Sequence, residues 1–376
     1  MAQTCRERVL CALSLREPDR VPLYEHLINT SVVNRLINRK VTGTVEEQIK
    51  AWVRCYKKLG IDMSFVILPG PSFEFAKGRD MVESPTIPAF KVTENTWIDE
   101  WGRTYRYMPE TDQAFMIGFS IKDEHDIDAF DFPKPNSPGR LSILKFAKKA
   151  MKALDHQMAI TCWVPGPFEH TNLLMGLDKF IVLLYNNPRA AEKLMDIVTD
   201  FALQIGQMFI EEGADVIDIS DDCAYRSGPM IHPNLYRKFI VPRVKRIAES
   251  FHSRGVKVIL HSDGNLNPIM DDLVSTGIDG LHSIEPQSGM DLGLLKRKYG
   301  GKICLLGNID TSQTLPFGTT SDVEEEVKRR IREAGPGGGY ILSSCNSISI
   351  AVPPKNVIAM FRAARRYGRY PLKTVE

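Results

Sequence analysis

Eight short runs of apolar residues recur along the chain, and segments with helical periodicity separate most of them. The runs span residues 21–26, 62–68, 158–164, 215–220, 256–260, 279–284, 302–307 and 339–344. Most lack the alternation of apolar and polar positions that marks a half-exposed strand, as expected when both faces are buried in a parallel sheet. Eight strands with helices between them predict an α/β fold, a TIM (β/α)8 barrel. A doubly wound open sheet is the main alternative.

One segment, roughly residues 70–135, interrupts this rhythm. Its stretch TWIDEWGRTYRYMP alternates polar and apolar positions, which predicts a β-hairpin near residues 90–110 inserted over the barrel mouth. The residues before the first run predict an N-terminal helical extension. We therefore expect residues 1–376 to form one domain with one insertion.

Local signals set the boundaries of two helices. Asn187 and Pro188 predict a helix start, as N-cap and first-turn proline, and Gly213 predicts the end of that helix. A second helix should begin near His232 and be kinked at Pro242, because proline removes a helical hydrogen bond.

Composition and charge exclude several classes of partner. The 376 residues are 43% hydrophobic and 25% charged, with a net charge of +2, which gives no long-range field for nucleic acid or anionic lipid. Charges interrupt the apolar residues of the N-terminus, so no signal peptide is predicted, and no apolar run is long enough to cross a membrane. The odd, scattered set of seven cysteines favours a reducing compartment over a disulfide framework. We expect a cytoplasmic protein.

Polar residues gather at the ends of the apolar runs, which is where a TIM barrel carries its chemistry. They are Trp163, Glu169, His170, Asp221, Asp222, His261, Asp263, Glu285, Asn308, Cys345 and Asn346. Imidazole, carboxylate and thiol donors that converge on one barrel mouth suit Zn²⁺. We predict a zinc site formed by four of these residues: His261, Asp263, Glu285 and Cys345.

Several of these residues also have a purely structural interpretation. His261 could bond a neighbouring backbone group, Asp263 could belong to a turn, and Glu285 could begin a loop. The ligand interpretation is favoured because the three occur together with a thiol. His282 lies inside the sixth run, where a core histidine is the ordinary interpretation, and we retain it as a reserve ligand.

The thiol at position 345 differs from two other cysteines. Cys162 and Cys304 lie among apolar residues within strands and are expected to be core, whereas Cys345 has polar neighbours that favour a functional thiolate. Asp221 and Asp222 could cap the following loop, and we expect at least one of them to face the mouth.

Five segments resemble the uroporphyrinogen decarboxylase superfamily, whose members are TIM barrels. They are WVPGPFE, DISDDCAYRSGPMIHPNLYRKFIVP, HSDGNLNPIMDDLVSTGIDGLHSIEP, GNIDTSQTLPFGT and GPGGGYILSSCNSI. The resemblance covers the chain from about residue 155 to its end, and more faintly REPDRVP near its start. The superfamily contains porphyrinogen decarboxylases and zinc methyltransferases that work with corrinoid proteins or thiols.

The decarboxylase branch is the weaker match. Its members carry an arginine in a QAGR-type stretch near the N-terminus, whereas the corresponding region here reads VPLYEHLINTSVV. A substrate with many carboxylates needs cationic partners. A metal-free decarboxylase that uses Asp221 or Asp222 as a general acid remains an alternative, as does a barrel that binds a ligand without turnover.

The methyltransferase branch is similar in the order His-x-Cys, Glu, Cys, which here becomes His261-x-Asp263, Glu285, Cys345. A carboxylate in place of one thiolate makes the site harder and favours an oxygen-bearing substrate. The resemblance thus implies O-demethylation, in which a methoxylated, aromatic compound gives its methyl group to Co(I) of a separate corrinoid protein. Zinc would act as a Lewis acid on the ether oxygen. A zinc methyltransferase that acts on a thiol is the alternative.

This interpretation also assigns roles to the other polar and aromatic residues near the barrel mouth. Glu169 or His170 would protonate the leaving oxygen or hold a ring substituent. Relatives also suggest a homodimer. The residues expected to bind the substrate are Tyr24, Trp163, Asp221, Asp222 and Asn308.

Overall fold

Six of the eight predicted strands form one parallel sheet in the computed structural model. The structure describes residues 3–41, 43–82, 88–110 and 113–372. In spatial order the strands are β12 (Tyr340–Ser344), β11 (Cys304–Ile309), β10 (Gly280–Ser283), β9 (Lys257–Ser262), β6 (Val216–Ser220) and β5 (Thr161–Pro165).

The first two predicted runs close this sheet into a barrel. Leu23 pairs in parallel with Leu342 of β12, and Met63 pairs in parallel with Ala159 just before β5. The two runs meet each other where Asp62 N donates to Leu23 O at 2.9 Å. All eight positions of the predicted barrel are therefore present, and the TIM-barrel prediction is confirmed.

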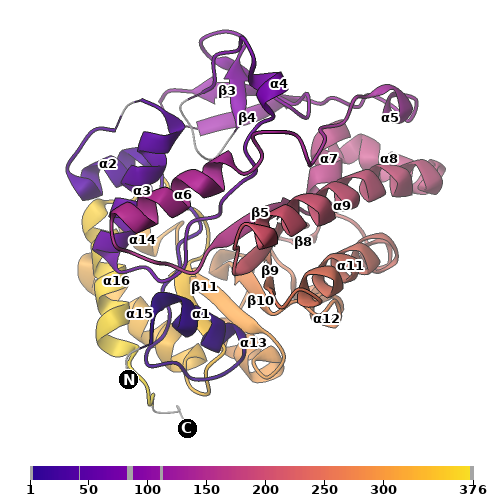
Figure 1. Ribbon diagram of the computed structural model, residues 1–376. Helices are drawn as coiled ribbons and strands as arrows, with labels where there is room; N and C mark the ends of the chain where they lie inside the picture. The colour runs from indigo at the N-terminus through magenta and orange to yellow at the C-terminus, as the bar shows by residue number, and fades with distance from the viewer. Residues whose placement is uncertain (1–2, 42, 83–87, 111–112, 373–376) are drawn as a thin grey trace.

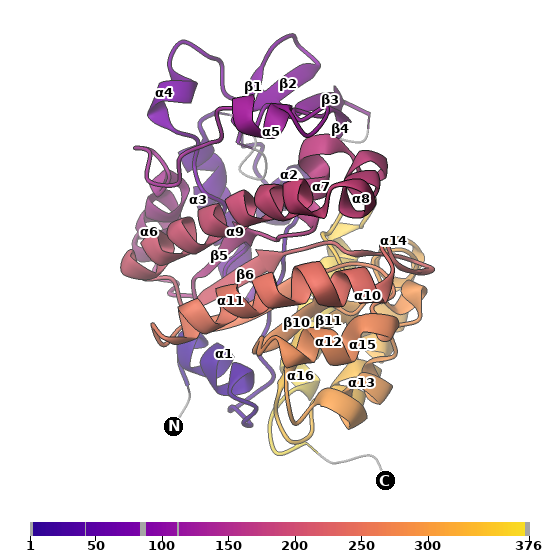
Figure 2. The same ribbon diagram turned by 90° about the vertical axis from the view of Figure 1, so that its right-hand side faces the viewer.

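Helices surround the barrel (Figures 1 and 2). None of those described has the length and apolarity that crossing a bilayer requires. In chain order they are α1 (Cys5–Leu13), α2 (Thr30–Ile37), α3 (Val45–Leu59), α4 (Phe73–Ala76), α5 (Asp126–Ala129), α6 (Ser142–Ala153), α7 (Glu169–Met175), α8 (Leu177–Asn186), α9 (Pro188–Glu211), α10 (Pro233–Leu235), α11 (Val241–His252), α12 (Met270–Ser275), α13 (Leu292–Tyr299), α14 (Thr314–Phe317), α15 (Thr320–Ala334) and α16 (Pro354–Tyr367). A π-helical turn, η1 (Tyr236–Ile240), and two 3-10 turns, η2 (Asn267–Ile269) and η3 (Pro286–Ser288), complete the set.

Both helix-boundary predictions correspond to observed features. Asn187 caps α9 by accepting a hydrogen bond from Ala190 N at 3.2 Å, and Gly213 follows the helix with φ +98°. The helix predicted to be kinked at Pro242 is interrupted by η1, which ends two residues earlier. A π-helical turn at this place accommodates the hydrogen bond that proline cannot donate.

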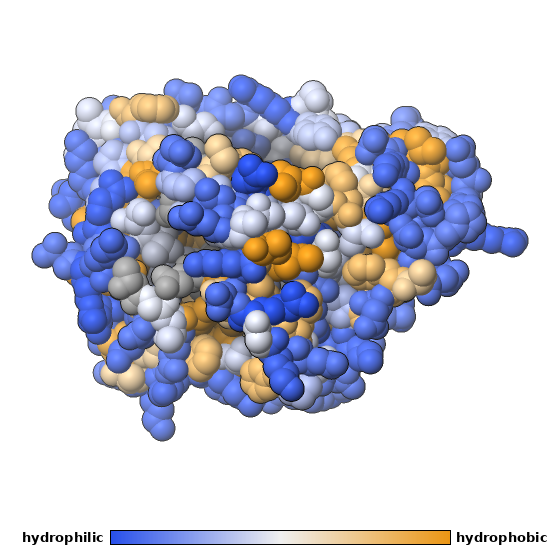
Figure 3. Space-filling model, turned by 90° about the horizontal axis from the view of Figure 1, so that it is seen from above, coloured by the Kyte–Doolittle hydropathy of each residue, from blue (hydrophilic) through white to orange (hydrophobic). Residues whose placement is uncertain are grey.

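The predicted hairpin is part of a larger antiparallel sheet. Its strands are β1 (Ala89–Lys91), β2 (Thr96–Asp99), β3 (Thr104–Met108) and β4 (Gln113–Gly118). This sheet lies at one end of the barrel and α1 lies at the other (Figures 1 and 2). Seen from the sheet's side, apolar residues are interspersed on a largely polar surface (Figure 3). A short antiparallel pair, β7 (Ala224–Tyr225) and β8 (Gly228–Pro229), follows β6.

The barrel interior near α1 is apolar. Side chains such as Val216, Ile259 and Ile341 form a cluster there, and Val9 and Leu13 of α1 cover it. Cys162 and Cys304 are fully buried, as expected for core cysteines.

At the α1 end, beside this apolar cluster, lies an ion-pair network. Arg8 Nη1 contacts Asp62 Oδ1 at 2.6 Å, Arg8 Nε contacts Asp19 Oδ1 at 2.6 Å, and Arg20 Nη1 contacts Asp62 Oδ2 at 2.7 Å.

Candidate active site

The predicted ligand His261 faces two carboxylates at the mouth of the barrel. Its Nε2 lies 3.8 Å from Asp222 Oδ1 and 3.9 Å from Asp263 Oδ1. Asp263 is held in place by Ser283 Oγ, which donates to its Oδ1 at 2.8 Å, and by the amide of Asn346. Asp263 N in turn donates to Asp222 Oδ1 at 2.8 Å. These three groups form a compact set of one nitrogen and two oxygen donors within 4.8 Å of one another.

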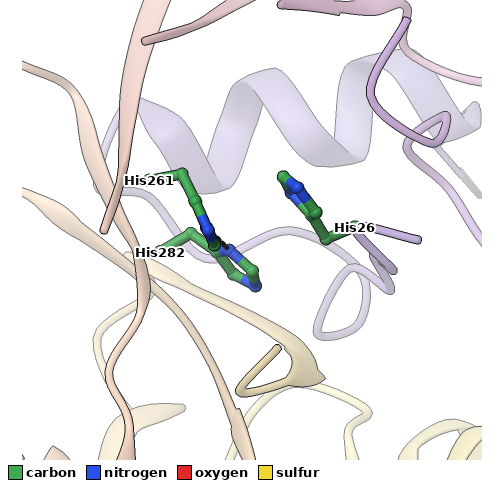
Figure 4. A group of neighbouring side chains, drawn as sticks. All are labelled: His26, His261 and His282. Atoms are coloured by element: carbon green, nitrogen blue, oxygen red, sulfur yellow. Dashed lines mark hydrogen bonds between the residues drawn. The ribbon is translucent and has the colours of Figure 1, made fainter. Parts of the chain in front are cut away.

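Two further histidines stand beside His261 (Figure 4). His282 Nδ1 lies 2.7 Å from His261 Nδ1, and His26 stacks on His261 with ring centroids 4.4 Å apart. Tyr24 OH contacts His26 Nδ1 at 3.2 Å. Burial lowers the pKa of both His26 and His282 well below the usual value, so both rings are neutral at neutral pH. His282 is fully buried and hydrogen-bonded, as expected of a core histidine, and it also contacts the predicted ligand His261.

The other two predicted ligands lie outside that compact set. Glu285 Oε2 accepts hydrogen bonds from Gly264 N at 3.1 Å and from Ser288 Oγ at 2.6 Å. Cys345 Sγ lies 3.3 Å from Thr311 Oγ1. Burial raises the pKa of the Cys345 thiol to about 12, so the thiol stays protonated unless a cation lies beside it. Neither residue belongs to the groups of three metal donors found among the described residues.

Glu169, at the start of α7, and Asp221, directly after β6, carry neighbouring carboxyl groups. Burial, and then the charges of Asp222 and Asp221, raise the pKa of Glu169 well above its usual value. Its Oε2 accepts hydrogen bonds from Ser220 Oγ at 3.2 Å and Asp222 N at 3.3 Å. Asp221 Oδ1 accepts from Phe168 N and Glu169 N, each at 2.8 Å, so it caps the start of α7. Asp222 is the member of the aspartate pair that faces His261.

Asp218, within β6, is a buried carboxyl group that was not among the predicted site residues. Both of its oxygens are buried without a hydrogen-bond partner among the described residues, and Oδ2 lies 3.8 Å from His26 Nδ1. Burial raises its pKa to about 7. An aspartate between apolar residues of a predicted strand was the available signal.

The sheet of β1–β4, called the insertion sheet below, contacts the mouth at His170 of α7 through the loop between β2 and β3. The ring of His170 packs edge-on against Trp101, with centroids 4.3 Å apart, and against Trp163 at 5.9 Å. Arg103 Nη1 lies 3.4 Å from His170 Nδ1, and Arg103 also pairs with Asp99 at 2.7 Å. Burial, and then the Arg103 charge, lower the pKa of His170, so this ring is neutral.

A cavity of about 1080 Å³ opens between the insertion sheet and the strand ends. Its aromatic lining is Trp52, Trp97, Tyr107 and Phe115, and its polar lining includes Glu285, Thr311 and Asn346. The predicted ligand Glu285 lines the cavity, and two other lining residues contact predicted ligands: Thr311 contacts Cys345 and Asn346 contacts Asp263. Of the predicted substrate residues, Tyr24 and Asn308 are fully buried, and Asn308 Nδ2 donates to Ile284 O at 2.9 Å.

Similar proteins include two curated methyltransferases and one solved structure. The methylcobamide:CoM methyltransferase MtaA of Methanosarcina barkeri is 27% identical over 226 residues, which cover 60% of this chain and 63% of that protein, less than two thirds of its length. The methylcobamide:CoM methyltransferase MtbA of Methanosarcina mazei is 26% identical over 68% of this chain and 72% of that protein. A methyltransferase structure from Methanosarcina mazei matches with a TM-score of 0.74 at 21% identity, covering 97% of this chain and 99% of that one.

These comparisons agree with the barrel and with the resemblance noted from the sequence. The structural match supports the fold over nearly the whole chain. The sequence relatives support the corrinoid-dependent methyltransferase branch. The model of the uroporphyrinogen decarboxylase (URO-D) family matches residues 106–367, more than half of the chain, and this protein therefore belongs to the URO-D family.

Proposed function

We propose that this protein is a zinc-dependent methyltransferase that moves the methyl group of a methoxylated aromatic compound to the reduced cobalt of a partner's corrinoid. The observation that carries the proposal is the His261 imidazole, whose Nε2 faces Asp222 and Asp263, and Asp263 is bonded by Asn346 of the cavity lining. The similarity to methylcobamide-dependent enzymes supports methyl transfer as the reaction class.

The donor atoms of His261, Asp222 and Asp263 fit zinc. Two ligand atoms on one tetrahedral Zn²⁺ lie about 3.3–3.5 Å apart when the bonds are about 2.0–2.2 Å. The donor separations at His261, 3.8 and 3.9 Å, need only small movements to match. In this proposal the ion is held by His261, Asp263, Glu285 and Cys345, of which Glu285 and Cys345 lie outside the compact set, and Asp222 is an alternative carboxylate ligand. When bound, zinc supplies Lewis acidity to the substrate's leaving atom and keeps the Cys345 thiol ionised.

Glu169 is the proton donor in this proposal. Burial and the neighbouring carboxylates raise its pKa well above the usual value, which favours the protonated carboxyl group, and Ser220 and Asp222 fix its position. His170 is neutral and accepts from Arg103, so it is better suited to holding a substrate substituent. In the reaction the methyl–oxygen bond breaks, the leaving oxygen takes the proton of Glu169, and the methyl group passes to the reduced cobalt.

The cavity suits an aromatic methyl donor. Its lining includes the aromatic residues Trp97, Tyr107 and Phe115, and its volume lies just above the range of about 300–1,000 Å³ for small-molecule sites. The lining includes Lys40 and Lys91 but no arginine among the residues described there. The pair of lysines offers less carboxylate binding than a porphyrinogen with many acid groups requires, which disfavours decarboxylation of such a substrate.

A thiol substrate is the second candidate, because the similar enzymes MtaA and MtbA carry coenzyme M in their names. The two candidates differ in donor hardness. Asp263 and Asp222 provide oxygen where a thiol-activating site would gain from a second thiolate, and Cys345 is the thiol that the proposal assigns to the metal.

One assay separates these functions. Zinc-loaded protein is mixed with free cob(I)alamin and a panel of methoxybenzoates, and in a second arm with methylcobalamin and coenzyme M. Methylcobalamin formation in the first arm supports O-demethylation, and loss of thiol in the second supports the alternative. Zinc-loaded protein that is inactive in both arms contradicts both, and decarboxylation that survives a chelator favours the metal-free decarboxylase.

A further inference from the structure

The three stacked histidines are close enough to suggest a metal site of their own, but their orientation argues against one. The ring planes of His26 and His261 differ by 18° and those of His26 and His282 by 11°. A histidine binds a metal through a lone pair in its ring plane, and lone pairs of nearly parallel rings do not converge on one point. The 2.7 Å contact between the Nδ1 atoms of His261 and His282 also occupies one nitrogen of each ring.

The hydrogen-bond partners determine where the protons lie in this group. His282 Nε2 lies 3.3 Å from Ser344 O, and a carbonyl oxygen only accepts, so Nε2 carries the proton. A neutral imidazole has one N–H, so His282 Nδ1 is an acceptor. His261 Nδ1 must then donate across the 2.7 Å contact. The remaining nitrogen of His261, Nε2, is the one that faces Asp222 and Asp263.

We propose that His282 is a positioning residue: it accepts the proton of His261 Nδ1, and so fixes the tautomer and ring orientation that direct the Nε2 lone pair of His261 to the metal. The Ser344 carbonyl is the anchor of this chain, because it fixes the tautomer of His282 in the same way. This inference rests on the proposed zinc site, since His282 acts through one of its ligands.

The physical basis is the effect of an outer partner on a ligating imidazole. Which ring nitrogen binds a metal is set by the hydrogen bond that the other makes. Without an acceptor at position 282, His261 would have a buried N–H with no partner, and the ring would gain by turning away. Loss of such a partner costs about 10–100-fold in metal affinity.

A pair of substitutions tests this role through zinc affinity, measured by competition with a chelator. His282→Leu removes the acceptor, and we expect zinc affinity to fall by about 10–100-fold. His282→Asn keeps an acceptor, because its amide oxygen and the imidazole Nδ1 are both attached to Cγ, and affinity should stay close to wild type. The control is His156→Leu, which removes a histidine bonded to Ile61 O at 3.1 Å outside the mouth.

Nitrogen-15 NMR of metal-free, histidine-labelled protein provides a readout that needs neither zinc nor activity. We expect His261 Nδ1 to be protonated and His282 Nδ1 to be unprotonated. The reverse assignment overturns the proposal, as does wild-type zinc affinity in a folded His282→Leu variant. If that variant does not fold, a large loss of zinc affinity in His282→Asn contradicts the role. Wild-type protein that binds no zinc refutes the proposed function, while the NMR result still decides the proton arrangement.

Discussion

The ionisable groups at the two ends of the barrel are arranged in opposite ways. At the α1 end, Arg8 and Arg20 meet Asp19 and Asp62 in ion pairs of 2.6–2.7 Å, and Leu23 N donates to the second oxygen of Asp62 at 2.9 Å. Each buried charge there has an opposite charge beside it. Removing one partner would leave the others uncompensated.

At the mouth, carboxyl groups gather around histidines. Asp218, Asp222 and Asp263 surround the His261 ring, and Asp218 has no hydrogen-bond partner among the described residues. Burial raises the pKa of Asp218 to about 7 and that of Asp263 to about 6. Burying several carboxyl groups together costs free energy unless a cation lies among them, so such a cluster is expected at a cation-binding site. The contrast agrees with the proposal that the α1 end contributes stability and the mouth contributes chemistry, the usual division in a TIM barrel.

The largest expected effect comes from removing a predicted ligand at the mouth. Cys345→Ala should lose nearly all bound zinc and reduce methyl transfer by more than the roughly 10–100-fold cost of losing an outer partner. The free energy of unfolding of metal-free protein should change little by comparison. Metal analysis by mass spectrometry checks this, with Cys304→Ala, a core cysteine, as the matched control. Full zinc content in Cys345→Ala would remove the thiol from the proposed site.

The next effect lies at the opposite end and concerns stability alone. Asp62→Ala leaves Arg8 and Arg20 without their shared partner, and we expect a loss of about 3–5 kcal/mol in the free energy of unfolding. Urea denaturation measures it. Glu46→Ala is the control, because its ion pair with Lys149 is exposed and should be worth about 0–1 kcal/mol. A folded Asp62→Ala protein with altered zinc affinity would contradict the separation of the two ends.

A smaller effect concerns the mouth, where Asp218 makes the free energy of unfolding depend on pH. The folded pKa of Asp218, about 7, exceeds its unfolded value of 3.8, so the folded state binds more protons between these pH values. This group therefore makes the free energy of unfolding fall as pH rises from about 4 to about 7. The groups that face it are His26, His261 and Asp222.

Asp218→Asn removes this titration. We expect the metal-free variant to be more stable than wild type above pH 8 by on the order of 1–3 kcal/mol, with the difference shrinking toward pH 4. Urea denaturation of metal-free protein across this pH range measures it. If the free energy of unfolding of the variant depended on pH as that of the wild type does, the pKa of Asp218 would not be raised in the folded protein.

The barrel and part of its mouth could be predicted from the sequence. Continuous apolar runs located all eight barrel positions, because strands buried on both faces leave that pattern. His261 and Asp263 were found because they directly follow such a run. The same rule applies to His26, which ends the run at residues 21–26 and so carries the same signal.

Other features depend on contacts that one-dimensional patterns do not contain. The pairing of His282 with His261 follows from the register of β10 against β9, which places the two residues side by side. Arg103 and Trp101 contact His170 only because the insertion sheet folds over the mouth. Asp221 was predicted to bind substrate or cap a loop, and its cap on α7 depends on how β6 lies beside β5.

The most direct test of the central claim is X-ray absorption at the zinc edge of the zinc-loaded protein. The proposed site predicts about one zinc per chain, with one sulfur at about 2.3 Å and nitrogen and oxygen ligands at about 2.0–2.2 Å. The sulfur should disappear in any zinc that Cys345→Ala retains. A spectrum without sulfur in the wild-type protein, or purified protein that cannot be loaded with zinc, would contradict the account.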